Sequence, residues 1–368
     1  MATTHPIDLL IVGSGPAGMA TALHLAAADP DWARRLVIVD KATHPRDKLC
    51  GGGLSPLAVR GLERLGLAVE VPHVAVPELE MRFEDRWFRV RSAPLLRIVE
   101  RREFDHWLVL CGERREITVR QGEAVEAVRP GADHVEVQTR RAVFRARAVV
   151  AADGASSFVR RCLGWDAGAR IGRLLQVAMP MPERTDERGP APAVFDFTVV
   201  QRGVQGYFWD FPGRSNGRPI RKYGIFDSRV RPERPWAPLR RELMRELEQR
   251  GTALDGAALR GHPVRWFEPA APLSQPRILL AGDAAGVDPL LAEGIPFALA
   301  HGEVAAGAII DAFERGDFRF AHYRERIRRH PLLGRLPRLR RVARLVYWER
   351  LPRWLIRTFW KAIPLLMR

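Results

Sequence analysis

The sequence predicts a mixed α/β (α+β) fold: one parallel-sheet domain, an inserted antiparallel-sheet domain and a C-terminal helical segment. Three observations predict it. Two continuous apolar runs, 7–12 and 35–40, flank a glycine turn and a helical stretch, which is the order of a parallel βαβ unit. Alternating patterns over 74–98 and strand-rich sequence over 170–230 indicate antiparallel strands. A chain of 368 residues with 46% hydrophobic residues is long enough to bury both domains.

The elements follow in chain order. The apolar run at 7–12 predicts a strand buried on both faces; a helix over 17–28 and a second buried strand over 35–40 come next. A proline-rich loop is expected near 180–192. Further helices are expected at 55–66, 103–113, 235–250 and 296–313, and further strands at 117–130, 134–140, 142–153 and 277–285, the last ending in a turn.

The strands of the parallel sheet come from separated pieces of chain, because the alternating regions interrupt them. We therefore predict a discontinuous first domain over residues 1–73, 96–165 and 271–315. A second domain with its own sheet is predicted over residues 74–95 and 166–270. Residues 316–368 remain as basic amphipathic C-terminal helices, which prolines divide into short pieces.

Cysteine usage indicates a reducing compartment. The three cysteines, Cys50, Cys111 and Cys162, form no CxxC pair, which argues against a disulfide framework or a zinc site, and no metal site is predicted. The first apolar run is too short for a membrane span and is followed by glycines rather than by a signal-peptide cleavage site. We therefore expect a cytoplasmic protein.

The formal net charge of +16 is concentrated at one end of the chain. Residues 319–368 carry 15 arginines and lysines against two glutamates, and the rest of the chain is near balance. Basic amphipathic helices with Trp348, Trp354 and Trp360 suit an anionic membrane surface, so we expect peripheral contact with the inner face of a membrane. A solvated arginine-rich cap is the alternative. Nucleic-acid binding is not expected, since no binding module accompanies the charge.

The segment Gly13-Ser14-Gly15-Pro16-Ala17-Gly18 follows a strand and opens a helix, the context in which GxGxxG indicates dinucleotide binding. Gly13 allows the tight turn, Gly15 lets the backbone approach a pyrophosphate, and Gly18 lets helix and strand pack closely. Asp40 ends the next strand, where a carboxylate accepts hydrogen bonds from a ribose. The alternative is a generic strand-turn-helix with a solvated Asp40, which leaves the complete spacing unexplained.

Three further segments point to FAD through a resemblance. Val99-Glu100-Arg101-Arg102-Glu103-Phe104-Asp105 resembles a helix start of the glutathione-reductase-type flavoproteins related to p-hydroxybenzoate hydroxylase, in which the arginine matching Arg101 lies close to FAD. Ala152-Asp153-Gly154 resembles their Asp-Gly motif. Ala281-Gly282-Asp283, followed by Glu293-Gly294-Ile295, resembles the motif whose aspartate binds the ribityl chain and whose Gly-Ile backbone faces the flavin. Each segment alone is also explained by a turn with a capping aspartate; their order and spacing favour a Rossmann-like FAD-binding domain.

Within that superfamily the sequence is most similar to the geranylgeranyl reductase family. Residues 45–54, PRDKLCGGGL, resemble its K-x-C-G-G segment, which sits beside the flavin. Residues 206–212, GYFWDFP, resemble its Y-x-W-x-F-P segment, which lines the substrate cavity. The similarity covers about residues 7–315. The turn after Pro289 departs from the family pattern, with Ala292 where the relatives often have glycine.

The resemblance and the fingerprint together imply a set of binding residues. The residues expected to bind FAD are Gly13, Gly15, Pro16, Ala17, Gly18, Asp40, Lys41, Lys48, Leu49, Gly51, Gly52, Arg101, Val125, Asp153, Gly154, Asp283, Gly294 and Ile295. Those expected to bind substrate are Tyr207, Trp209, Phe211 and Pro212. The three aromatic residues alternate along an expected strand and therefore share one face, with a Pro-Gly exit marking its edge. Core packing between the domains is the alternative to a tunnel wall.

The family reduces isolated carbon–carbon double bonds in prenyl chains, so the resemblance implies an FAD-dependent oxidoreductase acting on a polyprenyl lipid, quinone or pigment precursor. Hydride from flavin N5 must be coupled to protonation of the other alkene carbon. Cys50 is the predicted catalytic proton donor, since it is the one residue of the glycine loop that can donate a proton, and Lys48 is expected to influence its pKa. The alternative is that Cys50 only shapes the loop.

The electron source and two competing classes stay open. No second GxGxxG occurs, so no tightly bound NAD(P)H domain is expected, and electrons would come from transiently docked NAD(P)H or from ferredoxin. A monooxygenase, epoxidase or halogenase acting on a hydrophobic substrate is the first competitor. Tyr207 and Phe211 replace the first Trp and the Ile of the halogenase W-x-W-x-I-P motif, which counts against that branch. A membrane-peripheral flavoprotein without turnover is the second.

Overall fold

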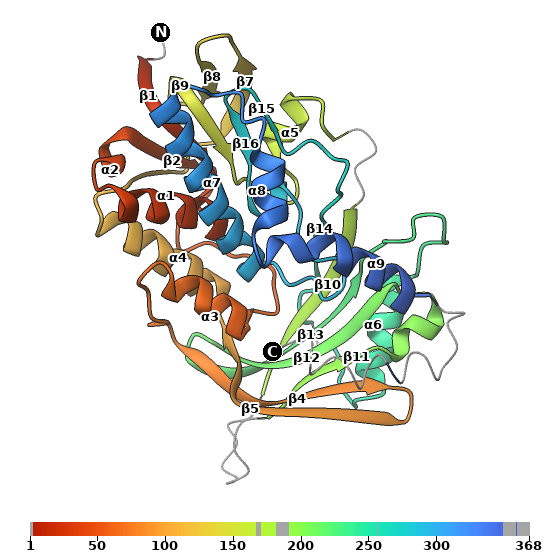
Figure 1. Ribbon diagram of the computed structural model, residues 1–368. Coiled ribbons are helices and arrows are strands. Elements are labelled where there is room, and N and C mark those ends of the chain that lie inside the picture. Colours follow the sequence, from red (N-terminus) through yellow and green to blue (C-terminus); the bar gives the residue numbers. More distant parts are fainter. Residues whose placement is uncertain (1–2, 167–170, 182–190, 255, 349–357, 359–368) are drawn as a thin grey trace.

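The computed structural model describes residues 3–166, 171–181, 191–254, 256–348 and 358. Its strands form two eight-stranded sheets, one largely parallel and one largely antiparallel. Figure 1 shows the two sheets as separate layers, with the helices of the first domain on one side and the curved second sheet below. The predicted α/β (α+β) fold class is confirmed.

The first sheet has a parallel centre in the order β16-β9-β1-β2-β6. β1 (Thr3–Val12) lies between β2 (Leu36–Asp40) and β9 (Ala142–Ala151) and runs parallel to both. β16 joins β9 from a distant part of the chain, so the sheet is assembled from separated pieces. The other strands of this sheet are β6 (Thr118–Gln121), β7 (Val125–Pro130), β8 (Val135–Thr139), β15 (Ser274–Gln275) and β16 (Ile278–Leu280).

Helix α1 (Pro16–Ala28) packs against α7 (Ile295–Arg315) and α4 (Arg101–Glu113). The α1–α7 contact is close: a Cβ on Gly302 of α7 would lie 2.5 Å from the Ala20 Cβ. Among the described helices, α7 is long and apolar enough to cross a membrane, but 78% of its apolar window is buried inside the protein, and packing accounts for its composition. The remaining helices of this domain are α2 (Trp32–Arg35), α3 (Pro56–Glu63), α5 (Phe158–Cys162) and the 3₁₀ turn η2 (Gly282–Ala284).

The second sheet has the order β14-β10-β13-β12-β11-β4-β5-β3 and is antiparallel except where β11 meets β4. The domain boundaries remain a prediction, and strands from both predicted pieces of the second domain lie in this sheet. The strands are β3 (Gly53–Leu54), β4 (His73–Phe83), β5 (Arg86–Val99), β10 (Ile171–Pro180), β11 (Ala193–Asp196), β12 (Gly206–Ser215), β13 (Arg218–Asp227) and β14 (Arg260–Arg265).

Strand β12 presents different residues to its two faces. Phe208 packs in a small core with Leu243 of α6 (Leu239–Glu248) and Val199 of η1 (Thr198–Arg202). Tyr207, Trp209 and Phe211 belong instead to the large core shared with the first domain, as the two-residue period of a strand requires. The expected edge at the Pro-Gly exit is wrong: β12 stays paired with β13 as far as Ser215, opposite Arg218.

Two short helices follow the first domain and cross toward the second sheet (Figure 1). They are α8 (Tyr323–Arg329) and α9 (Leu336–Val346), joined by η3 (Leu333–Arg335). Arg340 of α9 pairs with Glu268 at 3.1 Å, and the Arg344 guanidinium donates to the Val230 carbonyl at 3.1 Å. Of the tryptophans expected at a membrane surface, Trp348 is half-buried, and Trp354 and Trp360 lie outside the described residues.

Candidate active site

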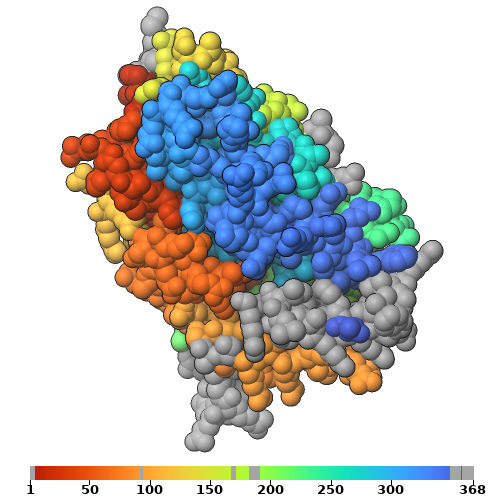
Figure 2. Space-filling model, in the orientation of Figure 1, coloured from red at the N-terminus to blue at the C-terminus, as the bar shows by residue number. Residues whose placement is uncertain are grey.

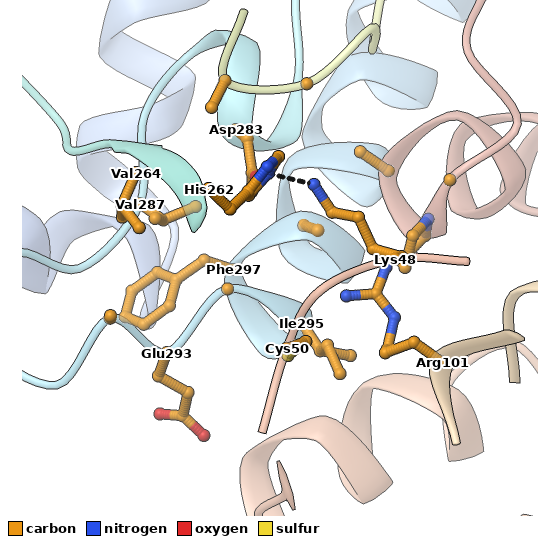
Figure 3. Close-up of a pocket in the computed structure, with 18 of the residues that line it drawn as sticks. Lys48, Cys50, Arg101, His262, Val264, Asp283, Val287, Glu293, Ile295 and Phe297 are labelled. Atoms are coloured by element: carbon orange, nitrogen blue, oxygen red, sulfur yellow. Dashed lines mark hydrogen bonds between the residues drawn. The ribbon is translucent and has the colours of Figure 1, made fainter. Parts of the chain in front are cut away.

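A cavity of about 1200 Å³ is lined by residues of both sheets and of α9. The glycine turn after β1, the 46–53 loop and the aromatic face of β12 all open onto it. Figure 3 shows part of its lining, with Lys48 and Arg101 on one side, His262 and Glu293 on the other, and Cys50 beside Ile295 between them. Almost all the predicted binding residues therefore lie around one space.

The turn after β1 is sterically closed on the protein side. Gly13 has φ +104°, and a Cβ there would lie 2.4 Å from the Ala152 carbonyl oxygen. A Cβ on Gly18 would lie 1.9 Å from the Gly13 carbonyl oxygen. Gly18 does not line the cavity. It faces the turn instead and allows α1 to pack closely against it. Only glycine satisfies these two positions.

Gly15 faces the opposite way, toward the cavity. A Cβ at this position would find only Arg46 nearby, with Nη2 at 3.5 Å. Gly15 is also the N-cap of α1, which has no side-chain cap and no acidic residue in its first turn. The N-terminus of α1 thus presents unpaired N–H groups and the positive end of the helix dipole to the cavity, which suits a phosphate group.

Asp40 holds the turn together. Its Oδ2 accepts hydrogen bonds from the Ser14 backbone N–H at 2.8 Å and the Ser14 hydroxyl at 2.7 Å, and its Oδ1 accepts one from the Ala42 N–H at 2.9 Å. Asp40 also lines the cavity. A carboxylate has further lone pairs, so these contacts leave capacity for a ribose hydroxyl.

Arg101 belongs to a buried ion cluster. Its guanidinium donates to both carboxylate oxygens of Asp105, at 2.7 and 2.8 Å, and Arg46 approaches the same carboxylate at 3.1 Å. Burial alone would raise the pKa of Asp105, but Arg101 outweighs burial and holds this pKa below its ordinary value. Burial alone would likewise lower the pKa of Arg101, and Asp105 raises it instead. Both groups are therefore charged, with Arg101 at the cavity wall and Asp105 buried behind it.

Lys48 contacts a residue that the sequence did not point to. Its ammonium lies 2.5 Å from His262 Nε2, on β14 of the second sheet, and Figure 3 shows the two side chains directed toward each other. Burial lowers the pKa of His262 to about 4, with a further contribution from Lys48, so the imidazole is neutral and accepts the hydrogen bond. Burial also lowers the pKa of Lys48. The two residues are 214 positions apart, and no local pattern connects them.

The Cys50-Gly51-Gly52 loop lies against the aromatic wall. A Cβ on Gly51 would lie 3.0 Å from the Phe211 ring, and one on Gly52, where φ is +83°, would lie 2.2 Å from the Val99 carbonyl oxygen. Cys50 is half-buried, and its sulfur accepts the Gly52 N–H at 3.4 Å. The glycines are thus required for close approach rather than for flexibility, and the thiol both shapes the loop and lines the cavity.

The Asp153-Gly154 turn leaves one polar atom without a partner. Asp153 Oδ2 accepts from the Phe158 and Val159 N–H groups at 2.7 and 3.1 Å, and so holds the start of α5. Its Oδ1 is buried and finds no hydrogen-bond partner among the described residues. A Cβ on Gly154 would meet nothing within 4 Å. Both features leave room and an acceptor for a bound molecule.

The segment before α7 also opens to the cavity. Gly294 is the N-cap of α7, again with no side-chain cap and no acidic residue in the first turn, and a Cβ on it would lie 3.6 Å from Asp283 Oδ1. Ala292 adopts the left-handed conformation, with φ +52°. This backbone favours glycine, so alanine at this position holds a conformation that L-residues rarely adopt.

Two acids in this segment, the buried Asp288 and the half-buried Glu293, were not predicted. Asp288 accepts from the Leu290 and Leu291 N–H groups at 2.7 and 2.9 Å, yet burial raises its pKa to about 6. Burial raises the pKa of Glu293 to about 7. A hydrogen bond from Ser55 lowers this pKa, and the nearby Asp288 raises it further. Glu293 is therefore partly protonated near neutral pH. The sequence signal was present, since Glu293 stands inside the quoted Glu-Gly-Ile motif, but its protonation depends on burial.

The aromatic wall is closely packed. Tyr207 donates to the Leu291 carbonyl, and the Trp209 ring fills the space over Gly224, where a Cβ would lie 2.1 Å from the indole. The Trp209 indole N–H is buried and has no partner among the described residues. Pro212 does not line the cavity, because it lies on the other face of β12. Of the predicted residues, those that line the cavity are Gly13, Gly15, Pro16, Ala17, Asp40, Lys41, Lys48, Leu49, Cys50, Gly51, Gly52, Arg101, Val125, Asp153, Gly154, Tyr207, Trp209, Phe211, Asp283, Gly294 and Ile295.

These observations fit FAD. The open position at Gly15 and the uncapped N-terminus of α1 suit the pyrophosphate, and Asp40 suits the adenosine ribose. The unpartnered Asp153 Oδ1 and the open side of Gly154 leave space along the same wall. Asp283 and the uncapped start of α7 suit the ribityl chain and the electron-rich edge of the flavin. The individual roles of these residues remain predictions.

Comparisons with known proteins agree with this picture. The family model of the FAD binding domain matches residues 6–316 of this chain. The chain is 30% identical to a menaquinone reductase of Mycolicibacterium smegmatis, over 81% of this chain and 75% of that protein. It is 29% identical to digeranylgeranylglycerophospholipid reductase 2 of Methanopyrus kandleri, over 84% of this chain and 78% of that protein. A solved geranylgeranyl bacteriochlorophyll reductase-like protein from Thermoplasma acidophilum has the same fold, with a TM-score of 0.73 at 21% identity, over 94% of this chain and 86% of that chain.

Proposed function

We propose, from the premise that this chain belongs to the FAD binding domain family, that it saturates isolated carbon–carbon double bonds in the geranylgeranyl or related polyprenyl group of a lipid, quinone or pigment precursor. The chain is an FAD-dependent oxidoreductase related to geranylgeranyl reductases. The observation that carries the proposal is the shared cavity: the glycine turn, the Cys50 loop and the apolar wall of Tyr207, Trp209 and Phe211 surround one space. That arrangement suits an apolar chain held beside a redox cofactor.

The residues of the chain would supply what the cofactor cannot. The hydride for one alkene carbon would come from bound FAD in its reduced form, which an electron donor must first supply. The other carbon needs a proton, and Cys50 and Glu293 both line the cavity. Burial raises the pKa of Glu293 to about 7, so its carboxyl is partly protonated near neutral pH. The Tyr207 hydroxyl donates its hydrogen bond to the Leu291 carbonyl. Tyr207 would therefore position the prenyl chain rather than donate a proton to it. The aromatic wall excludes water, which keeps the hydride from being lost to side reactions.

Anaerobic turnover tests the proposal directly. The FAD-loaded protein is reduced with dithionite, mixed with menaquinone or a digeranylgeranyl glycerophospholipid in neutral detergent, and followed by flavin absorbance and by mass spectrometry of the lipid. We expect reoxidation of the flavin and a gain of two hydrogens for each bond reduced. If no prenyl chain is ever saturated, the proposal fails. Rapid oxygen consumption stimulated by an aromatic compound would favour the monooxygenase or halogenase class instead.

The pH dependence of the same reaction should distinguish Glu293 from Cys50. If Glu293 donates the proton, the rate of prenyl reduction should fall about tenfold per pH unit above pH 7, because a pKa of about 7 leaves the carboxyl deprotonated there. Glu293→Gln should slow the reaction about 10²–10⁴-fold and remove this pH dependence. A Cys50→Ala variant is the matched comparison. If Cys50→Ala slows prenyl reduction by the same factor, and Glu293→Gln keeps the wild-type pH profile, the proton comes from Cys50.

The electron donor and the location are proposed on the sequence alone. We propose that NAD(P)H docking transiently, or ferredoxin, reduces the protein, and stopped-flow reduction by each donor would decide between them. We also propose a cytoplasmic protein with peripheral membrane contact through the basic C-terminal segment. Cosedimentation with anionic vesicles, lost on removal of residues 349–368, would support that contact.

A further inference from the structure

The cavity reaches the C-terminal helix α9, which the sequence had assigned to a membrane surface. Arg338, Leu339 and Val342 of α9 line the cavity, together with Arg335, which ends η3 and is the N-cap of α9, and Leu332 before η3. Spacings of three, four and seven residues place these side chains on one face of a helix. Leu332, Leu339 and Val342 extend the apolar wall of the cavity. The two arginines give this part of the wall a positive charge. Figure 2 shows the C-terminal helices, in blue, lying across the surface of the molecule.

These two arginines combine two properties: they line the cavity, and they have no counterion among the described residues. On the same helix, Arg340 pairs with Glu268 at 3.1 Å and Arg344 with Glu233 at 3.6 Å. Within the described part of the chain, neither Arg335 nor Arg338 has a side-chain hydrogen bond or ion pair, and both are exposed. The ion pairs that hold α9 in place are therefore those of Arg340 and Arg344, not of Arg335 and Arg338.

The helix start strengthens the positive potential at the same place. α9 begins at Leu336 with Pro337 in its first turn, and it has neither a side-chain cap nor an acidic residue there. The Leu336 N–H donates to the Leu333 carbonyl and Pro337 has no N–H, so the start of α9 contributes the positive end of its helix dipole rather than free donors beside the two guanidinium groups. A helix N-terminus next to two forked arginine donors is an arrangement suited to a phosphate.

We propose that Arg335 and Arg338 form a phosphate-binding subsite for the head group of the prenyl substrate, whose tail occupies the aromatic part of the cavity. The inference rests on the proposed function for the identity of the tail. It favours a prenyl phospholipid or prenyl phosphate over a neutral prenyl quinone, because a quinone ring offers no charge to the two arginines. The alternative source of phosphate is the surrounding membrane, and the position of both residues on a cavity wall favours the substrate.

Equilibrium binding tests the subsite without turnover. The oxidised, FAD-loaded protein in neutral detergent is titrated with geranylgeranyl phosphate and with geranylgeraniol, which share one tail and differ in the phosphate, and binding is followed by tryptophan and flavin fluorescence. The wild type is expected to bind the phosphate at least tenfold more tightly. The Arg335→Gln/Arg338→Gln double variant should bring the two affinities to within about threefold by weakening only the phosphate. Arg335→Lys/Arg338→Lys should retain part of the preference, since the charge remains.

Arg341 provides a matched control, since it is exposed on the same helix, has no hydrogen-bond or ion-pair partner among the described residues and does not line the cavity. Arg341→Gln should keep the full preference for the phosphate. FAD content and melting temperature of each variant show that it is folded. Equal affinities of the wild type for the two ligands, or a preference that survives in the double variant, would overturn the subsite.

Two further readouts separate the possible failures. If the double variant loses only cosedimentation with anionic vesicles and keeps its preference in detergent, the arginines serve a membrane surface and the substrate assignment is wrong. If the arginine-dependent preference is found but no double bond is ever reduced, the proposed reductase activity fails while the subsite stands. The binding experiment and the anaerobic turnover experiment thus fail independently.

Discussion

Replacing Gly15 by alanine is expected to give a stable protein that no longer retains FAD. The backbone at Gly15, with φ −73° and ψ −179°, is open to alanine, and the new Cβ would meet only Arg46 Nη2 at 3.5 Å, so we expect the free energy of unfolding to change by no more than about 0.5 kcal/mol. The methyl group would point into the space where the pyrophosphate is expected to approach the backbone. We expect FAD affinity to fall at least about 100-fold, a loss of roughly 2.8 kcal/mol.

The measurement is the FAD content of the purified protein, followed by fluorescence titration of the stripped protein with FAD. Gly307→Ala is a closely matched control, since a Cβ there would also meet only an arginine nitrogen, Arg326 Nη1 at 3.7 Å, but on α7 and away from the cavity. It should retain FAD fully and stabilise α7 by up to about 1 kcal/mol. Unchanged FAD affinity in Gly15→Ala would refute the placement of the pyrophosphate at this turn.

The second large effect is expected at Asp105, on stability. Its side chain is fully buried and pairs with both Arg101 and Arg46. Asp105→Ala would leave two cations facing each other with little solvent, and breaking a buried ion pair from one side costs about 3–5 kcal/mol. Urea denaturation with saturating FAD measures the loss. Glu136→Ala, which removes the exposed pair with Arg129, should cost less than about 1 kcal/mol.

The pH dependence of this difference has a defined sign. The pKa of Asp105 is lower in the folded protein than in the unfolded chain, so its contribution to stability is present above the unfolded value of about 3.9 and is lost as the pH falls through the folded value. The gap between wild type and Asp105→Ala should therefore be constant near neutral pH and shrink in acid. A gap of the same size at every pH would show that Asp105 acts through packing rather than charge.

The features that could be predicted from sequence are those encoded over short spans. The Gly13–Gly18 turn, its strands and the helix it opens are contiguous, so the glycine spacing and the apolar runs fix them together. Triple glycine behind Cys50 likewise indicated close approach, which the Gly51 contact with Phe211 and the φ of Gly52 explain. The alternation of Tyr207, Trp209 and Phe211 placed them on one face. The family patterns, not local physics, supplied the identity of the cofactor.

What the sequence missed depends on register and on burial. Whether Pro212 faces the cavity follows from which face of β12 the first domain covers, and the strand continues past it because β13 is long enough to pair there. The Lys48–His262 contact joins β14 to a loop near the other end of the chain. The protonation of Glu293 and Asp288 is set by desolvation, to which many distant segments contribute at once.

The sequence by itself therefore determined the fold class, the glycine turn and the residue types of the cofactor wall, since each depends on neighbours within a few turns of chain. The tertiary structure alone decided which charges lose their solvent and which remain free. It placed Arg335 and Arg338 at the cavity while Arg340 and Arg344 pair with Glu268 and Glu233. Arginines of one run differ in their surroundings for a physical reason: their counterions come from segments far away in the chain, and only the packed fold brings these to Arg340 and Arg344.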